Sequence, residues 1–165
     1  MCGSYGGELR ASHSSIATFA ISLLLFACER AGEDPPATAP TAEERIEVLL
    51  SDLVDAIQAK QPVFVMDHVS EGFKDDRGLD YFGVRSLVES YAFRDEEIGA
   101  RLESVAITPA ANGAQRVSAR VAFAVGQRLA ASGPLPPGAV TYSFDVVFAR
   151  SGAHWQAIGG NYLRE

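Results

Sequence analysis

The spacing of the apolar residues changes once along this chain, near Gly99, from the period of a helix to that of a strand. Between residues 42 and 60 the apolar side chains recur every third or fourth position, which places them on one face of a helix. Between residues 117 and 125, and again between 140 and 148, they alternate along the chain, as in a strand with one buried face. Helices followed by strands predict an α+β domain, with the helices packed on one face of a curved antiparallel sheet.

Capping residues predict where the helices begin. Thr41 and Glu44 have the spacing of a capping box, in which each side chain accepts a hydrogen bond from the other residue's backbone. Pro62 suits the first turn of a second, shorter helix, and Asp80 can cap a third. The third helix has an apolar stripe made of Val84, Leu87, Val88 and Tyr91. We expect helices over residues 42–60, over 63–69 and after Asp80, with the polar run at 74–78 following the second.

Turn residues separate the expected strands. Asn112-Gly113, the segment 133–138 and Ser151-Gly152 carry the Gly, Pro, Asn and Ser residues that favour turns. Gly159-Gly160 indicates a bend or bulge inside the last strand. The sequence thus predicts a four-stranded antiparallel sheet, with strands at residues 102–108, 117–125, 140–148 and 154–163.

An uncharged apolar run, residues 14–27, ends at Leu25-Phe26-Ala27-Cys28. A membrane-spanning helix needs about 20 residues, so this run has the length of the apolar part of a secretory signal peptide. Its last four residues resemble a bacterial lipobox, which implies cleavage between Ala27 and Cys28 and a lipid on the Cys28 thiol. The predicted segments are a signal peptide at 1–27, a lipid-anchored tether at 28–41 and one domain at 42–165.

The residues that follow Cys28 predict where the domain is held. Residues 29–41 contain three prolines and no large apolar side chain, so they are expected to form a semi-extended tether. A lipid on Cys28 predicts a membrane-anchored protein of the bacterial cell envelope that faces the periplasm. Glu29 stands where an aspartate marks inner-membrane retention in some bacteria, which favours the outer membrane.

Charge and cysteine content exclude several kinds of chemistry. The chain has 21 acidic and 14 basic residues without a basic cluster, so no nucleic acid partner is expected. Cys2 falls in the predicted signal peptide and Cys28 is the predicted lipid site, so no thiol is left for catalysis or metal binding. His68 and His154 are far apart in the sequence, and no glycine-rich phosphate loop is present. We expect neither a metal nor a cofactor.

The order of helices and strands, with Trp155 opening the last strand, resembles the nuclear transport factor 2-like (cystatin-like) superfamily. The resemblance covers residues 43–165, and a closer one to small envelope lipoproteins of that fold rests on Ala59-Lys60-Gln61-Pro62, Gly78-Leu79-Asp80 and His154-Trp155-Gln156-Ala157-Ile158. It implies a cone-shaped domain whose curved sheet wraps a long helix around a pocket, and commonly a homodimer formed through the sheet. Some members are isomerases, dehydratases or polyketide cyclases and many only bind or scaffold, so the fold does not fix the function.

Three residues are the candidates for proton transfer. Asp67 and His68 offer an acid and an imidazole at the expected mouth of the cone, but neighbours on a helix point about 100° apart. Asp145 lies on the polar face of its strand, where a cross-strand ion pair with Arg120 is the structural interpretation. A catalytic site would require an inward-facing acid beside His68.

Five aromatic residues are candidates either for lining a pocket or for the core: Tyr91, Phe123, Tyr142, Phe144 and Trp155. The first hypothesis is that the domain binds a small apolar ligand or a protein partner without catalysis. The second is a cofactorless isomerase, dehydratase or cyclase that uses His68 with Asp67 or Asp145. The third is a structural module that dimerises through its sheet. An open apolar pocket would favour the first hypothesis, and a cone filled by its own side chains the third.

Overall fold

Helix α1 (Ala42–Gln58) is the first element of residues 39–165, the part of the chain that this computed structural model describes. The predicted signal peptide, the cleavage and lipidation site at Ala27 and Cys28, and most of the tether lie outside the described residues. The Thr41 hydroxyl accepts a hydrogen bond from the Glu44 amide at 3.2 Å, and the Glu44 carboxylate accepts one from the Thr41 amide at 2.7 Å. The predicted capping box, and with it the predicted start of this helix, is confirmed.

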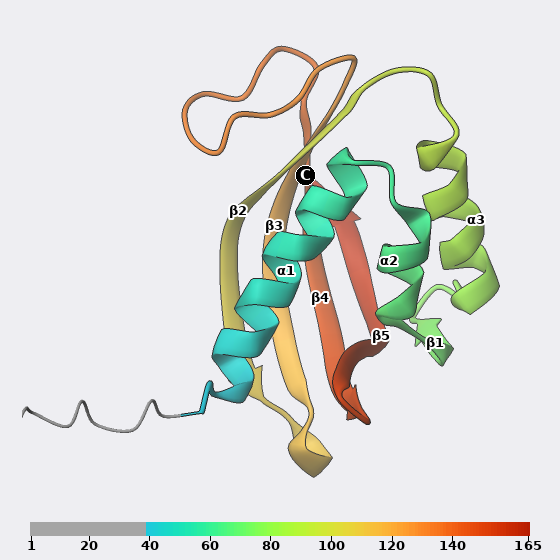
Figure 1. Cartoon of the computed structure of the whole chain (residues 1–165), viewed down its shortest axis with the longest axis vertical. Coiled ribbons are helices and arrows are strands. Elements are labelled where there is room, and N and C mark those ends of the chain that lie inside the picture. The colour runs from blue at the N-terminus through green and yellow to red at the C-terminus, as the bar shows by residue number, and fades with distance from the viewer. Residues whose placement is uncertain (1–38) are drawn as a thin grey trace, which may run out of the picture. The chain divides into compact units, whose positions relative to one another are not determined.

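α1 buries the apolar face that its periodicity predicts. Ile46, Leu49 and Ala56 are buried, and Ile46 is completely inaccessible to solvent. The helix crosses the front of the sheet in Figure 1 and packs chiefly against β2 (Ile98–Pro109). α1 is therefore the helix that closes the core.

The second helix is shorter than predicted, because the chain after it forms a strand. α2 covers Pro62–Asp67, and β1 follows directly as Val69–Asp75, where the sequence predicted the end of a helix and a polar run. β1 runs parallel to β5 (His154–Arg164), and the Ala157 amide donates to the His68 carbonyl at 2.8 Å. Only Phe73 of this strand is buried, so β1 lacks the alternation that marks a half-buried strand.

Helix α3 (Tyr81–Ala92) begins where the sequence predicts and differs from α1 in its burial. The Asp80 carboxylate caps it by accepting a hydrogen bond from the Gly83 amide at 2.9 Å. No residue of α3 is buried, although Val84 packs against the core. α3 therefore stands beside the core and does not close it.

The sheet has five strands in the order β1-β5-β4-β3-β2, one more than the four predicted. β3 (Gln115–Val125), β4 (Val140–Ser151) and β5 confirm three predicted strands, and β2 contains the fourth. These four pair in antiparallel fashion, and the additional strand β1 joins the edge of β5 in parallel. The pairing of β4 with β5 passes from Val147 with Gly159 to Phe148 with Ala157, which leaves Ile158 as an extra residue beside the predicted Gly159-Gly160 irregularity.

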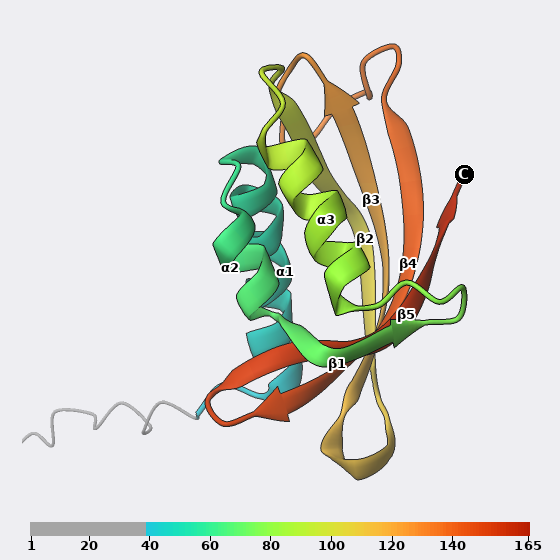
Figure 2. The same ribbon diagram turned by 90° about the vertical axis from the view of Figure 1, so that its right-hand side faces the viewer.

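The two faces of the sheet differ in what covers them. The inner face carries the helices, and its core consists of Ile46, Leu49, Phe73, Val117, Ala119, Phe148, Trp155 and Ala157. The outer face carries polar residues of β3, β4 and β5. Figure 2 shows that the sheet is curved and that the ends of β4 and β5 near the C-terminus bend away from the helices. The core therefore fills one end of the inner face and not the other.

Candidate functional site

Four aromatic side chains continue the inner face beyond the core. Val117 pairs with Val146 and Ala119 pairs with Phe144, so Phe144 lies on the core side of β4. Tyr142 and Phe123 follow on the same side, and Tyr162 of β5 pairs with Phe144. We call this group the aromatic surface, and it consists of Phe123, Tyr142, Phe144 and Tyr162.

The rings of the aromatic surface contact one another as a cluster. Phe123 meets Tyr142 edge-on with a centroid distance of 5.8 Å, and Tyr142 lies 6.2 Å from Phe144. Tyr162 lies 6.3 Å from Tyr142 and 6.2 Å from Phe144. These distances fall in the range of favourable aromatic pairs, so the rings support one another without a covering element.

The aromatic surface is only half-buried, because the helix beside it does not close over it. Each of its four side chains keeps part of its area exposed. In α3 the residues Leu87 and Tyr91 are each 44% exposed. Figure 2 shows β4 and β5 diverging from α3 toward the C-terminus. Apolar area is thus left open to solvent on the side of the sheet where a core would normally bury it.

Three of the five aromatic residues predicted to line a pocket belong to the aromatic surface: Phe123, Tyr142 and Phe144. Tyr91 lies apart from them on α3, where the Arg94 guanidinium sits 4.9 Å from its ring centroid. Trp155 is buried in the core with Ile46 and Val117, so it packs the domain and does not line an open surface.

The prediction from sequence missed Tyr162, the fourth member of the aromatic surface. Strict alternation from the inward-facing Trp155 and Ala157 would direct Tyr162 outward. The extra residue Ile158 shifts the alternation by one position, and Tyr162 turns inward opposite Phe144. The Gly159-Gly160 pair was the available signal, but it does not say how many residues the bulge adds.

His68 and Asp67 lie where α2 ends, and they face different partners. The Nδ1 atom of His68 is 2.9 Å from the Trp155 carbonyl oxygen, to which it donates a hydrogen bond. The ring of His68 packs against Phe64 and His154, with centroid distances of 5.0 and 6.1 Å. Asp67 is exposed, and its backbone carbonyl accepts a hydrogen bond from Gln156 at 3.1 Å. Among the described residues, no carboxylate is hydrogen-bonded to His68.

Asp145 lies on the outer face, where its ion-pair partner differs from the prediction. Its carboxylate is 3.7 Å from Arg116, whereas Arg120 forms a bidentate pair with Glu165 at 2.9 and 2.5 Å. The register explains the change, because Arg120 is opposite Ser143, and Ser143 also donates to Glu165. Asp145 and His68 are therefore not brought together.

The outer-face network changes the acidity of one carboxyl group. The guanidinium of Arg120 and the hydroxyl of Ser143 lower the pKa of Glu165 from 4.5 to about 2. Beside this network lies a depression of about 310 Å³ lined by Lys74, Asp76, Arg116, Asp145, Val147, Ile158, Gly159, Gly160 and Asn161. This part of the outer face thus carries charged groups, in contrast to the aromatic surface behind it.

Solved structures share this arrangement of helices and sheet. A scytalone dehydratase-like protein from Novosphingobium aromaticivorans is 12% identical, with a TM-score of 0.61 over 74% of this chain and 84% of its own. A nuclear transport factor 2-like superfamily protein from Salmonella enterica is 14% identical, with a TM-score of 0.56 over 74% of this chain and 89% of its own. The fold is nuclear transport factor 2-like.

A third structure extends well beyond the shared fold. Bd1075 of Bdellovibrio bacteriovorus is 14% identical, with a TM-score of 0.59 over 73% of this chain, and the match spans only 40% of Bd1075. The sequence matches no protein-family model and no curated protein. At these identities the likeness establishes the nuclear transport factor 2-like fold, and the function has to be inferred from the residues of this chain.

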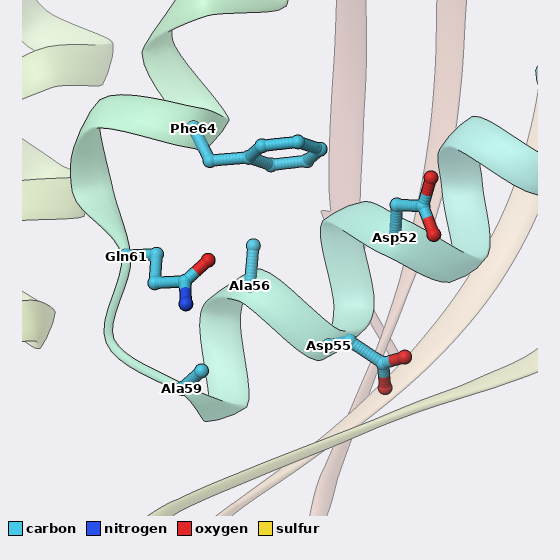
Figure 3. A pocket seen from close by; sticks show the side chains of 6 residues that line it. All are labelled: Asp52, Asp55, Ala56, Ala59, Gln61 and Phe64. Atoms are coloured by element: carbon cyan, nitrogen blue, oxygen red, sulfur yellow. The ribbon is translucent and has the colours of Figure 1, made fainter.

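A second depression of this nuclear transport factor 2-like domain lies between α1 and α2. Its volume is about 240 Å³, and it is lined by Asp52, Asp55, Ala56, Ala59, Gln61 and Phe64. Figure 3 shows the Phe64 ring above Ala56, while the Asp52 and Asp55 carboxylates point away from it. The lining groups do not converge on one point, so we assign no binding role to this depression.

Neither a metal centre nor a membrane-spanning helix occurs in residues 39–165. No three side chains of His, Cys, Asp or Glu gather there at a distance suited to one metal ion. None of the helices described is long and apolar enough to cross a membrane. The aromatic surface is the candidate functional site.

Proposed function

We propose that this chain is a lipid-anchored protein of the bacterial envelope whose nuclear transport factor 2-like domain binds a small apolar molecule on the aromatic surface. The observation that carries the proposal is the half-buried state of four clustered rings on the core side of the sheet. Exposed aromatic side chains favour ligand binding, because an apolar ligand that displaces water from them lowers the free energy of the complex. Binding sites for small molecules are typically lined by such residues.

Helix α3 supports the proposal from the other side. Val84 contacts the core, and Val88 and Tyr91 follow at helical spacing on the same side of α3. Leu87 and Tyr91 are each 44% exposed. Apolar area is thus open to solvent on this helix as well as on the sheet.

The proposed anchor places the domain close to a source of apolar molecules. A tether of residues 29–41 reaches at most about 45 Å from the bilayer when fully extended. Molecules that partition into lipid are concentrated within that distance. A binding domain held there meets such ligands more often than a freely diffusing one.

The catalytic alternative lacks a supporting contact. A cofactorless isomerase, dehydratase or cyclase needs an acid and a base at one substrate atom. His68 is bound to a backbone carbonyl and Asp145 pairs with Arg116 on the outer face. We therefore propose binding, and a product detected in place of bound ligand would instead favour catalysis.

Binding is tested with phenylnaphthylamine, a neutral apolar dye whose fluorescence rises in apolar surroundings. Titration into the purified full-length protein should show saturable binding. Phe144→Ala should weaken it by roughly fivefold to tenfold, because part of a phenyl contact is lost. Phe82→Ala is the matched control, since Phe82 is 72% exposed at the start of α3 and should leave the affinity unchanged. Absence of binding, or equal loss in both variants, would contradict the proposal.

Lipidation is tested separately in cells. Cys28→Ser should accumulate as an unprocessed precursor that a labelled fatty acid does not mark, because the thiol that receives the lipid is gone. Cys2→Ser removes the other cysteine and should mature normally. Normal maturation of the Cys28 variant would refute the anchor and leave the proposed ligand site untouched.

A further inference from the structure

We infer that the ligand of the aromatic surface is an amphiphilic anion, an apolar body that carries one acidic group, held by Arg77 and Arg164. The inference rests on the proposed function and specifies the class of ligand. It is carried by the position of the Arg77 guanidinium and by the register of Arg164 in β5, two residues that are 87 positions apart in the sequence.

Arg77 stands over the edge of the aromatic surface. It lies in the turn between β1 and α3, and its guanidinium carbon is 5.4 Å from the Tyr162 ring centroid. A guanidinium above a ring is attracted by the negative face of the ring, and its N–H groups remain free to donate in the plane of the group. Arg77 can therefore hold an anion while Tyr162 contacts the apolar body.

Arg164 reaches the same surface from the end of β5. It pairs with Tyr142 across the sheet, two residues beyond Tyr162 on the same strand. Side chains that are directly paired, or two residues apart, lie on one face of a sheet. Arg164 therefore borders the aromatic surface on the side of Tyr142, as Arg77 does on the side of Tyr162.

The ion pairs of the described residues leave these two cations free. The five salt bridges formed within residues 39–165 use Arg85, Arg101, Arg116, Arg120 and Arg128.

The two carboxylates that precede Arg77 in the sequence accept hydrogen bonds from groups other than its guanidinium. Asp75 accepts from the Arg77 and Leu79 amides at 2.9 and 2.6 Å, and Asp76 accepts from Asn161 at 2.9 Å. In a chain of net charge -7, two unpaired arginines at the edge of one apolar surface indicate a negatively charged ligand group.

The chemistry of the site selects the ligand class. A planar guanidinium matches a carboxylate or another oxyanion with two parallel hydrogen bonds. Displacement of water by the apolar body lowers the local dielectric constant and strengthens this contact. A neutral apolar molecule would cover the rings of the aromatic surface but would offer no anionic group to Arg77 or Arg164.

Two dyes that differ by one charged group test the inference. Anilinonaphthalene sulfonate has the ring system of phenylnaphthylamine and adds a sulfonate. The full-length protein should bind the sulfonate dye more tightly. Arg77→Gln and Arg164→Gln should each weaken sulfonate binding by roughly fivefold, as expected for a partly exposed ion pair, and leave phenylnaphthylamine binding within twofold. Added salt should weaken only the sulfonate dye.

The control is Arg45→Gln, which removes one positive charge from the exposed side of α1 and should change neither affinity. Circular dichroism verifies that each variant is folded. If both dyes bind equally, and the arginine variants leave their ratio unchanged, the anionic ligand is refuted while the apolar site stands. If neither dye binds, the proposed function fails as well.

Discussion

Helices α1 and α3 begin alike but differ in what covers them. Each is capped by its preceding residue, Thr41 or Asp80, and each carries an apolar stripe in the sequence. α1 buries its stripe against the sheet, whereas no residue of α3 is buried. A helical stripe therefore predicts a helix, but it does not tell whether the protein itself covers that stripe. The stripe of α3 packs beside α2 and β1 and stays partly open to solvent.

The largest expected effect is a difference in stability loss between a substitution in α1 and one in α3. Ile46→Ala in α1 should lower the free energy of unfolding by about 2 to 5 kcal/mol, because a fully buried side chain leaves a cavity. Leu87→Ala in α3 should lower it by less than about 1 kcal/mol, since that side chain is 44% exposed. Urea unfolding measures both. Equal losses would mean that α3 closes a core as α1 does.

A smaller effect is expected at the bulge that turns Tyr162 to the inner face of the sheet. An added Cβ in Gly160→Ala would lie 2.5 Å from the Asp145 carbonyl oxygen and 2.8 Å from the Val146 Cα, both backbone atoms. We expect a loss of about 1 to 3 kcal/mol in the free energy of unfolding.

Gly72→Ala in β1 is the control for this substitution. Its added Cβ would meet only the Ser70 hydroxyl, at 3.8 Å. If Gly160→Ala and Gly72→Ala have the same free energy of unfolding, β4 and β5 can move apart at Gly160 without loss of stability. The bulge would then not be what holds the aromatic surface in place.

The smallest effect concerns the ion pair behind the aromatic surface, on the outer face of the strands that diverge from α3. Glu165 has a pKa of about 2, lowered by Arg120 and Ser143. Because the folded pKa is depressed, the pair stabilises the fold above the ordinary pKa of 4.5, and this contribution is lost as the pH falls through about 2.

In Arg120→Gln the pKa of Glu165 should rise toward 4.5, as measured by an NMR titration of its carboxyl carbon. Arg116→Gln removes the neighbouring pair with Asp145 and should leave that pKa low. An unchanged value in the Arg120 variant would contradict the assigned pair. α1, which packs chiefly against β2, should keep its stability through this titration.

The sequence predicts the parts of this fold that local patterns encode. The caps at Thr41 and Asp80 and the alternation of β3 and β4 were sufficient to place helices and strands. β1 was not predictable, because only Phe73 is buried in it and its parallel pairing is with residues 85 to 88 positions further along the chain.

The candidate site was predictable only in part, for the same reason. Phe123, Tyr142 and Phe144 follow from alternation within two strands. Tyr162 depends on the length of a bulge, and the meeting of Arg77 with its ring depends on tertiary structure. The acidic composition gave no sign that two arginines lie at the edge of one apolar surface.

The central claim is that α3 and the sheet leave an apolar surface for a ligand, and NMR tests it most directly. Phenylnaphthylamine added to the labelled full-length protein should shift the aromatic signals of Phe123, Tyr142, Phe144 and Tyr162, together with the methyl signals of Leu87. Shifts confined to the outer face, at Val147 and Leu163, or to the depression between α1 and α2, would contradict the account.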